Sequence, residues 1–251
     1  MMNYIYYGLI GLFILIIIIY FGNSFISGIQ TYNSQSTWIV NGTQLARSPK
    51  TISGSLIPPS NSGRYGIEFT YLTWLYVNDI IKTNENHYQP ILIKGSSSTS
   101  DDGMPFLASP GILLGKNGNE LTIVMNVLRR NQPVMFESDS KPVEYVTIDN
   151  IPMGKWFQLG VVLMNNKMDV YINGQIKTRK QFDGIPDINM SDLHVASNNG
   201  FDGFISNAIY FASAVPYYKI DQHFRTGPSQ KPCDITGARP PYLAPNYWTS
   251  T

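Results

Sequence analysis

The chain has 251 residues, of which 43% are hydrophobic and 13% aromatic, which is enough apolar material for one large domain with accessory segments. Its formal net charge of +1 provides no electrostatic basis for binding nucleic acid, so we expect no nucleic-acid partner. Cys233 is the single cysteine, which excludes an intrachain disulfide and a cysteine-based metal site.

The N-terminal segment is strongly apolar. Residues 4–21, YIYYGLIGLFILIIIIYF, contain no charged side chain, and the first charged residue of the sequence is Arg47. About 18 such residues are enough to cross a bilayer as a helix, with aromatic rings at both interfaces. We therefore expect a short tail at residues 1–3 and a single transmembrane helix at residues 4–25 that anchors the chain in a lipid bilayer. A cleaved signal peptide is the alternative, although no Lys or Arg precedes the apolar run.

A polar segment follows. Residues 26–63 are rich in Ser, Thr, Asn and Gly and end in SGSLIPPSNSG. This composition predicts a stalk between membrane and domain, with a short strand at STWIV, residues 36–40. Asn41 and Asn189 each begin an Asn-x-Ser/Thr tripeptide, which is a glycosylation site only if the domain is lumenal. The orientation stays open, because neither flank of the apolar run carries Lys or Arg.

From Gly66 onward, β-branched and aromatic runs alternate with turn sequences such as NGN, NQP and SDSKP. No convincing long amphipathic helix follows the N-terminal segment. Many strands at short spacing predict an all-β domain over residues 64–225, built as an antiparallel two-sheet sandwich or jelly roll. The expected strands lie within residues 66–77, 90–95, 110–127, 133–137, 143–148, 155–164, 193–197 and 203–214.

Two turn signals lie close together in VVLMNNKMDVYINGQIKTRK, residues 161–180. Asn165-Asn166 and Asn173-Gly174 each predict a two-residue hairpin, because Asn and Gly tolerate positive backbone φ angles. Between them the apolar residues are the even-numbered ones of 168–172, which fits a strand with one buried face. The stretch therefore predicts a three-stranded meander over a core.

The C-terminal segment, residues 226–251, contains five prolines and no strand pattern. We expect a Pro-rich tail that lies extended over the domain surface or binds a neighbour. Tyr242, Tyr247 and Trp248 favour docking, since freely disordered tails are usually poor in aromatic residues.

The order of these pieces resembles the laminin G-like branch of the concanavalin A-like lectin/glucanase superfamily over residues 64–222. The matching motifs are Gly154-Lys155-Trp156 at a strand start, Tyr171-Ile172-Asn173-Gly174 at a hairpin, and Phe201-Asp202-Gly203-Phe204-Ile205 in a late strand. The resemblance implies a concanavalin A-like sandwich with Trp156 in its core. The positions assigned to the structural motif are Trp74, Trp156, Tyr171, Asn173, Gly174, Phe201 and Gly203.

A narrower resemblance concerns the phrases PGILLGKNGNELTIVMN, NIPMGKWF and MDVYING behind an apolar N-terminus. They are similar to membrane-linked proteins of large DNA viruses. This implies a minor-capsid-type structural protein in a virion membrane or host endomembrane, with neighbouring capsid proteins as partners.

Catalysis is not expected. Hydrolases of this superfamily carry Glu-x-Asp-x-x-Glu on one strand, because retaining cleavage needs two carboxylates about 5 Å apart. No such array occurs, and the nearest approach, Glu137-Ser138-Asp139, lies in turn sequence. His87, His194 and His223 are scattered without a nucleophile motif. We therefore expect no catalytic residues.

Loop carboxylates are the candidate ligand site. Laminin G-like domains often bind calcium in loops, and the resemblance implies Asp101 and Asp102, in GSSSTSDDGMP, as metal ligands. Asp202 joins them as a ligand-binding candidate. The alternative is that these loops are simply solvated.

Two functions are compatible with the sequence, which favours the first. The first is a membrane-anchored structural protein that grips its neighbours, favoured by the polar stalk, the aromatic tail and the missing catalytic acids. The second is a lectin-like module that recognises a glycan or receptor, with or without calcium, through loops such as residues 96–109.

Overall fold

The computed structural model describes residues 7, 10–22, 36–63, 66–78, 87–116, 118–128 and 142–233. The chain divides into two compact units, Met1–Ser36 and Thr37–Thr251. The strand expected at 133–137, the acidic residues at 137–139 and the tail beyond residue 233 lie outside the described residues.

The first unit contains a helical segment. Residues 10–22 form a helix whose side chains, from Ile10 to Phe21, are exposed. Within the residues that the structure describes, no helix combines the length and the apolar character that a membrane crossing requires.

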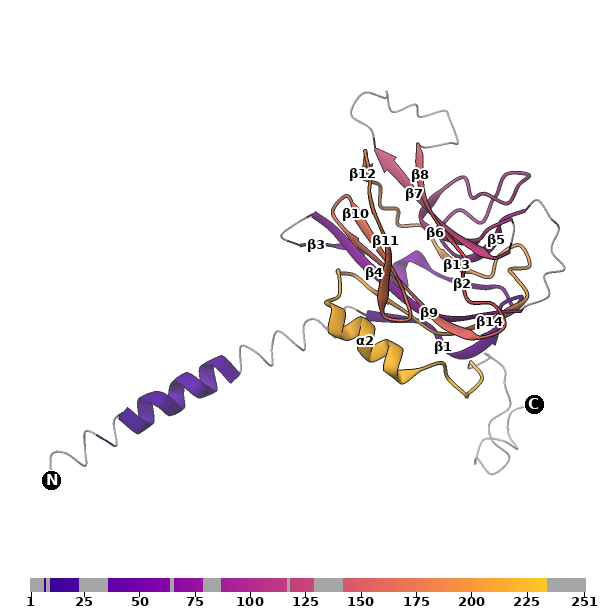
Figure 1. Ribbon diagram of the computed structural model, residues 1–251. Helices are drawn as coiled ribbons and strands as arrows, with labels where there is room; N and C mark the ends of the chain where they lie inside the picture. The colour runs from indigo at the N-terminus through magenta and orange to yellow at the C-terminus, as the bar shows by residue number, and fades with distance from the viewer. Residues whose placement is uncertain are drawn as a thin grey trace, which may run out of the picture. The chain divides into compact units, whose positions relative to one another are not determined.

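The second unit is a sandwich of two antiparallel sheets, which confirms the main expectation from the sequence (Figure 1). Among the described residues, one sheet has the order β1-β14-β4-β9-β10-β11, with β3 beside β4, and the other has the order β12-β7-β6-β5-β13-β2, with β8 beside β7. The first sheet consists of β1 (Ser36–Leu45), β3 (Asn61–Gly63), β4 (Gly66–Val77), β9 (Trp156–Met164), β10 (Lys167–Ile172), β11 (Gln175–Gln181) and β14 (Gly203–Phe211). The second consists of β2 (Lys50–Ile52), β5 (Gln89–Gly95), β6 (Ala108–Leu114), β7 (Glu120–Leu128), β8 (Val143–Asp149), β12 (Ile185–Pro186) and β13 (Leu193–Val195), and a 3-10 turn, η1, spans Gly54–Leu56.

The core lies between the sheets and follows the two-residue period of the strands. On β4, Phe69, Tyr71 and Leu75 point inward, and on β9 Phe157 and Leu159 do the same. Burying a side chain of this size stabilises the fold by about 1.5–3 kcal/mol. The pairing of β4 with β9 therefore contributes much of the core.

Trp156 does not fill the core, contrary to the expectation from the resemblance. It is half-buried, whereas its neighbour Phe157 is fully buried. Trp156 is the Cα partner of Tyr76, and both lie on the outer face of the first sheet. Because successive side chains of a strand point to opposite faces, placing Phe157 in the core forces Trp156 outward.

The sandwich also includes residues assigned to the stalk from composition. The strand expected at residues 36–40 forms and extends to Leu45 as β1, while β2, η1 and β3 follow before residue 64. Ile39 and Val40 are buried in the core. The polar residues of β1 fit an edge strand with one side exposed to solvent. Composition alone does not distinguish such a strand from a linker.

The predicted meander is confirmed. β9, β10 and β11 are joined at Asn165-Asn166 and at Asn173-Gly174. The φ angles of Asn173 and Gly174 are 51° and 74°, as a type I′ hairpin requires. Met168 is fully buried on the core side of β10.

The sequence reading missed helix α2 (Tyr217–Thr226), which packs on the outer face of the first sheet. The indole ring of Trp74 stacks on Phe224 at a centroid distance of 5.8 Å, and the indole N–H donates to the carbonyl of His223 at 3.3 Å. Ile220 is the buried residue of the helix, which ends at Gly227 with φ 74°. A glycine with positive φ is a common helix terminator.

Gln158 on β9 connects α2 to the sheet. Its side-chain amide donates to the carbonyl of Ile220 at 2.9 Å, lies 2.9 Å from Nδ1 of His223, and accepts the Gly174 N–H at 2.9 Å. The other ring nitrogen of His223, Nε2, lies 2.9 Å from the carbonyl of Asn207. These partners match a neutral imidazole that donates from Nε2 and accepts at Nδ1.

The segment after α2 closes against strand β1. The N–H of Thr43 donates to the carbonyl of Lys231 at 2.8 Å, and the N–H of Cys233 donates to the carbonyl of Thr43 at 2.8 Å. Pro232 and Thr43 form a parallel bridge. The described beginning of the tail thus adds main-chain bonds to an edge strand.

We predict that unfolding depends on pH through His223. Burial lowers its pKa below the ordinary value of 6.5, and the hydrogen bond to Asn207 opposes this only in part. The folded state therefore binds fewer protons than the unfolded state, so stability is complete above about pH 6.5 and is lost as pH falls through the lowered pKa. Urea unfolding between about pH 7.5 and about pH 5 should show a falling free energy of unfolding.

The His223→Gln variant should flatten this pH dependence, because glutamine does not titrate. His194→Gln, on β13 of the other sheet, is the matched control for replacing a histidine by glutamine. An unchanged slope in His223→Gln would contradict the assignment.

Candidate ligand-binding cleft

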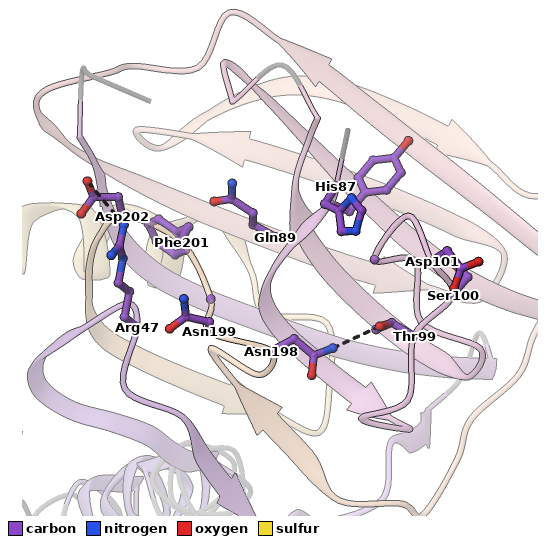
Figure 2. A pocket seen from close by; sticks show the side chains of 13 residues that line it. Arg47, His87, Gln89, Thr99, Ser100, Asp101, Asn198, Asn199, Phe201 and Asp202 are labelled. Carbon is purple, nitrogen blue, oxygen red and sulfur yellow. Dashed lines mark hydrogen bonds and ion pairs between the residues drawn. The ribbon is translucent and has the colours of Figure 1, made fainter. Parts of the chain in front are cut away.

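A cleft of about 850 Å³ opens among the loops of the sandwich (Figure 2). Its volume lies within the range of about 300–1,000 Å³ that is typical of ligand sites. The loop between β5 and β6 forms one wall, the segment between β13 and β14 forms the other, and the start of β5 lies between them. The lining residues are Arg47, His87, Tyr88, Gln89, Thr99, Ser100, Asp101, Gly103, Asn198, Asn199, Gly200, Phe201 and Asp202.

The first wall is held by Asp102. Its carboxylate accepts hydrogen bonds from the hydroxyl of Ser100, from the N–H of Met104 at 3.3 Å and from Nζ of Lys116 at 3.2 Å. The bond from Ser100 holds the pKa of Asp102 below its ordinary value, with help from Lys116 and Met104 and against partial burial. Lys116 also lies 5.0 Å from the ring centroid of Tyr88, a cation–π distance.

These contacts do not fit a calcium ion at Asp102, because an ammonium group already neutralises the carboxylate. In the described residues, no three His, Cys, Asp or Glu side chains gather as a metal site would require. Asp101, in contrast, lines the cleft. A calcium ion held through Asp101 stays a prediction.

The second wall has an unusual backbone. Ala196, Asn198, Asn199 and Gly200 all have positive φ, between 49° and 68°. Asn visits this left-handed region readily, but a fully buried alanine rarely does. Such conformations persist only where the surroundings enforce them, and they concentrate at functional sites.

Gly200 locks this wall against the turn after β1. A Cβ atom added at Gly200 would lie 1.9 Å from the carbonyl oxygen of Ala46. The same carbonyl accepts the N–H of Phe201 at 3.2 Å, so the two segments are in main-chain contact. The position therefore admits glycine alone.

Side chains link the walls across the cleft, as Figure 2 shows. The amide of Asn198 donates to the hydroxyl of Thr99 at 3.1 Å. At the other side, Arg47 and Asp202 approach to 3.8 Å, with 55% and 45% of their side chains exposed. An exposed pair at this distance contributes little to stability, so both charges remain accessible to a ligand.

The lining is chemically polar. The side-chain amides of Gln89, Asn198 and Asn199 offer both donors and acceptors, while Asp101 and Asp202 accept only. This set suits a ligand that carries many hydroxyl groups.

The structure brings together two of the three carboxylates singled out in the sequence, Asp101 and Asp202, and places Asp102 in the wall. Asn41 is exposed on β1, whereas the side-chain amide of Asn189 bonds to the carbonyl of Lys94 at 2.9 Å and to the N–H of Ser191 at 3.1 Å. Several lining residues were not singled out from the sequence, although the Asn-Asn-Gly turn signal at 198–200 was available. These are Arg47, Tyr88, Gln89, Asn198, Asn199 and Gly200.

No protein-family model matches the chain, and no curated protein matches it. Solved structures with a similar arrangement include the botulinum neurotoxin serotype D ligand-binding domain in complex with N-acetylneuraminic acid, with 10% identity, a TM-score of 0.49 and 78% of this chain covered. The botulinum neurotoxin DC binding domain in complex with SialylT has 14% identity and a TM-score of 0.48, and the type G receptor-binding domain has 10% and 0.47, each covering 76% of this chain. The chain covers about half of each domain, namely 52%, 46% and 46%.

We predict that Gly200→Ala destabilises the second unit by about 2 kcal/mol or more, since it adds a backbone clash to the strain of positive φ. Gly174→Ala is a matched control, because Gly174 also has positive φ, at 74°, but the atoms nearest to an added Cβ, on the side chain of Phe224, lie 3.7 Å away, which is an ordinary contact. That control should lose about 1 kcal/mol. Urea unfolding measures both, and equal losses would show that Gly200 does not lock the wall.

Proposed function

We propose that the chain is a non-enzymatic, lectin-like binding module whose cleft takes a glycan. The observation that carries the proposal is the cleft itself, a ligand-sized space lined largely by amide, hydroxyl and carboxylate groups. Each hydroxyl of a sugar both donates and accepts a hydrogen bond. Side-chain amides can both accept hydrogen bonds from these hydroxyls and donate to them, and carboxylates accept from neighbouring hydroxyls.

The rigidity of the walls supports the same proposal. Asp102 is bonded to Ser100 and Lys116 in one wall, and Gly200 packs against Ala46 in the other. A site whose polar groups are already ordered loses less conformational entropy when a ligand binds. This matters for glycans, because individual hydrogen bonds to a solvated ligand contribute only about 0.5–1.5 kcal/mol each.

The proposed binding is tested by incubating the full chain in detergent with an array of immobilised glycans, then titrating the bound glycans in solution. Asn199→Gly removes an amide and keeps a residue that tolerates φ 68°, and Asp101→Ala removes a carboxylate. Each should weaken binding about tenfold, the effect of about 1.4 kcal/mol. Repeating the titration with a calcium chelator shows whether binding depends on a calcium ion held through Asp101.

Asn41→Ala is the control, because Asn41 is an exposed polar residue on β1 outside the cleft. It should bind as the wild type does. The proposal fails if the wild type binds no glycan, or if the cleft variants bind as tightly as Asn41→Ala.

A second proposal concerns location. The helical residues 10–22 expose an unbroken apolar surface, and no charged residue precedes Arg47. We infer that residues 4–25 attach the module to a lipid bilayer. The capsid-type role implied by the narrower resemblance rests on the sequence, and a membrane-attached binding module is compatible with it.

Attachment predicts that the full chain stays with membranes during an alkaline carbonate wash. The double variant Ile14→Lys, Ile18→Lys should be released, since a charge near the centre of a spanning helix costs about 2.5–3.5 kcal/mol. The double variant Ile14→Leu, Ile18→Leu is the matched control and should stay bound. Release of the wild-type chain would refute attachment.

A further inference from the structure

The outer face of the first sheet carries two tryptophans with different surroundings. Trp74 is buried beneath α2, where its ring stacks on Phe224 and its indole N–H donates to His223. Trp156, at the start of β9, is half-buried and packs against aromatic residues of the sheet itself. The indole N–H of Trp74 is therefore hydrogen-bonded within the fold, whereas Trp156 exposes part of its surface.

Trp156 belongs to an aromatic cluster with Tyr76 and Phe204. The three residues occupy neighbouring positions on β9, β4 and β14, since Tyr76 is the Cα partner of both Trp156 and Phe204. Their ring centroids lie 5.6, 6.0 and 6.3 Å apart, and all three side chains are half-buried. Rings at these distances support one another, which holds the cluster in place.

Two polar groups of the cluster, the indole N–H of Trp156 and the hydroxyl of Tyr76, have no hydrogen-bond partner among the described residues. The corresponding groups of Trp74 and Tyr210 are bonded, the latter to the carbonyl of Pro58 at 3.0 Å. Aromatic rings that combine apolar surface with unused donors are typical of binding surfaces.

The aromatic cluster lies next to the cleft. Asp202 lines the cleft, and Phe204 follows it after a single residue, Gly203. The N–H of Asn78, just beyond Tyr76 on the same strand end, donates to the carbonyl of Asp202 at 3.0 Å. The aromatic cluster is thus joined to the cleft lining through Asp202.

We propose that the aromatic cluster is a second subsite for the same glycan, where a pyranose ring packs on Trp156. This inference rests on the function proposed above, since it extends the glycan bound in the cleft. A pyranose ring presents C–H groups on its faces and hydroxyls around its edge. The C–H groups pack against the aromatic cluster, and hydroxyls accept from the indole N–H of Trp156 and exchange hydrogen bonds with the hydroxyl of Tyr76.

The test follows nuclear magnetic resonance signals of the full ¹⁵N-labelled chain in detergent micelles. The probes are hexasaccharides of glucose, mannose, galactose and N-acetylglucosamine, each beside its monosaccharide. A hexasaccharide that binds should shift the indole signal of Trp156 and the amide signals of Asn198 and Asn199, whereas its monosaccharide should shift the two asparagines alone. The indole signal of Trp74 is the internal control and should not move, because α2 covers that ring.

Trp156→Ala assigns the indole signal and should weaken hexasaccharide binding about tenfold, the effect of about 1.4 kcal/mol, with monosaccharide affinity unchanged. The wild-type shifts decide the question even if this variant folds poorly. Shifts in the cleft without a shift at Trp156 would overturn the subsite and leave the proposed function intact. Shifts at Trp156 alone would support a sugar site at the aromatic cluster and overturn the function proposed for the cleft, and no shift at either place would overturn both.

Discussion

Antiparallel pairing of β4 with β9 and β14 decides which face of the first sheet each side chain occupies. Once Phe69 and Leu75 enter the core, Trp74 and Tyr76 must lie on the outer face, because the side-chain period of a strand is two. The same pairing brings Tyr76 opposite Trp156 and Phe204. The register between β4, β9 and β14 thus determines the core, the surface on which α2 packs and the aromatic cluster.

The outer face of the first sheet has one part covered by α2 and one part beyond the helix. α2 shields Trp74 and Gln158, and Gln158 satisfies the helix backbone, the hairpin at Gly174 and His223 together. A buried amide with all these partners stabilises only this docking arrangement, since losing one partner would leave a buried polar group unpaired. Beyond the helix, Trp156 remains partly open at the same end as the cleft.

The sheet architecture was readable from the sequence because strand alternation and hairpin chemistry are local. Asn173-Gly174 favours its turn through the local backbone preferences of Asn and Gly. The alternating apolar residues Met168 and Val170 indicate the buried face of β10. The prediction that Trp156 lies in the core was wrong because the preference of a large aromatic residue for the core does not show which face of its strand that residue occupies. Helix α2 was missed because it is only ten residues long and is held by tertiary contacts with Trp74 and Gln158.

The cleft was harder to predict because its residues come from distant segments. Asp101 and Asp202 were singled out separately as loop carboxylates, yet only the folded chain places them around one space with Arg47 and Asn199. Asp102 differs from Asp101 through its contacts with Ser100, Met104 and Lys116, which residue spacing alone does not predict.

The main-chain bonds between Thr43 and the segment at residues 231–233 have a consequence for self-association. Edge strands are templates on which a second sheet can grow, and here the β1 edge is already engaged at Thr43 by the protein's own chain. The opposite edge of that sheet, β11, carries Lys177, Arg179 and Lys180. Arg179 pairs with Asp169 and Lys180 pairs with Glu144, so the fold holds charged side chains along this edge. Both borders of the first sheet therefore carry features that disfavour the addition of another strand.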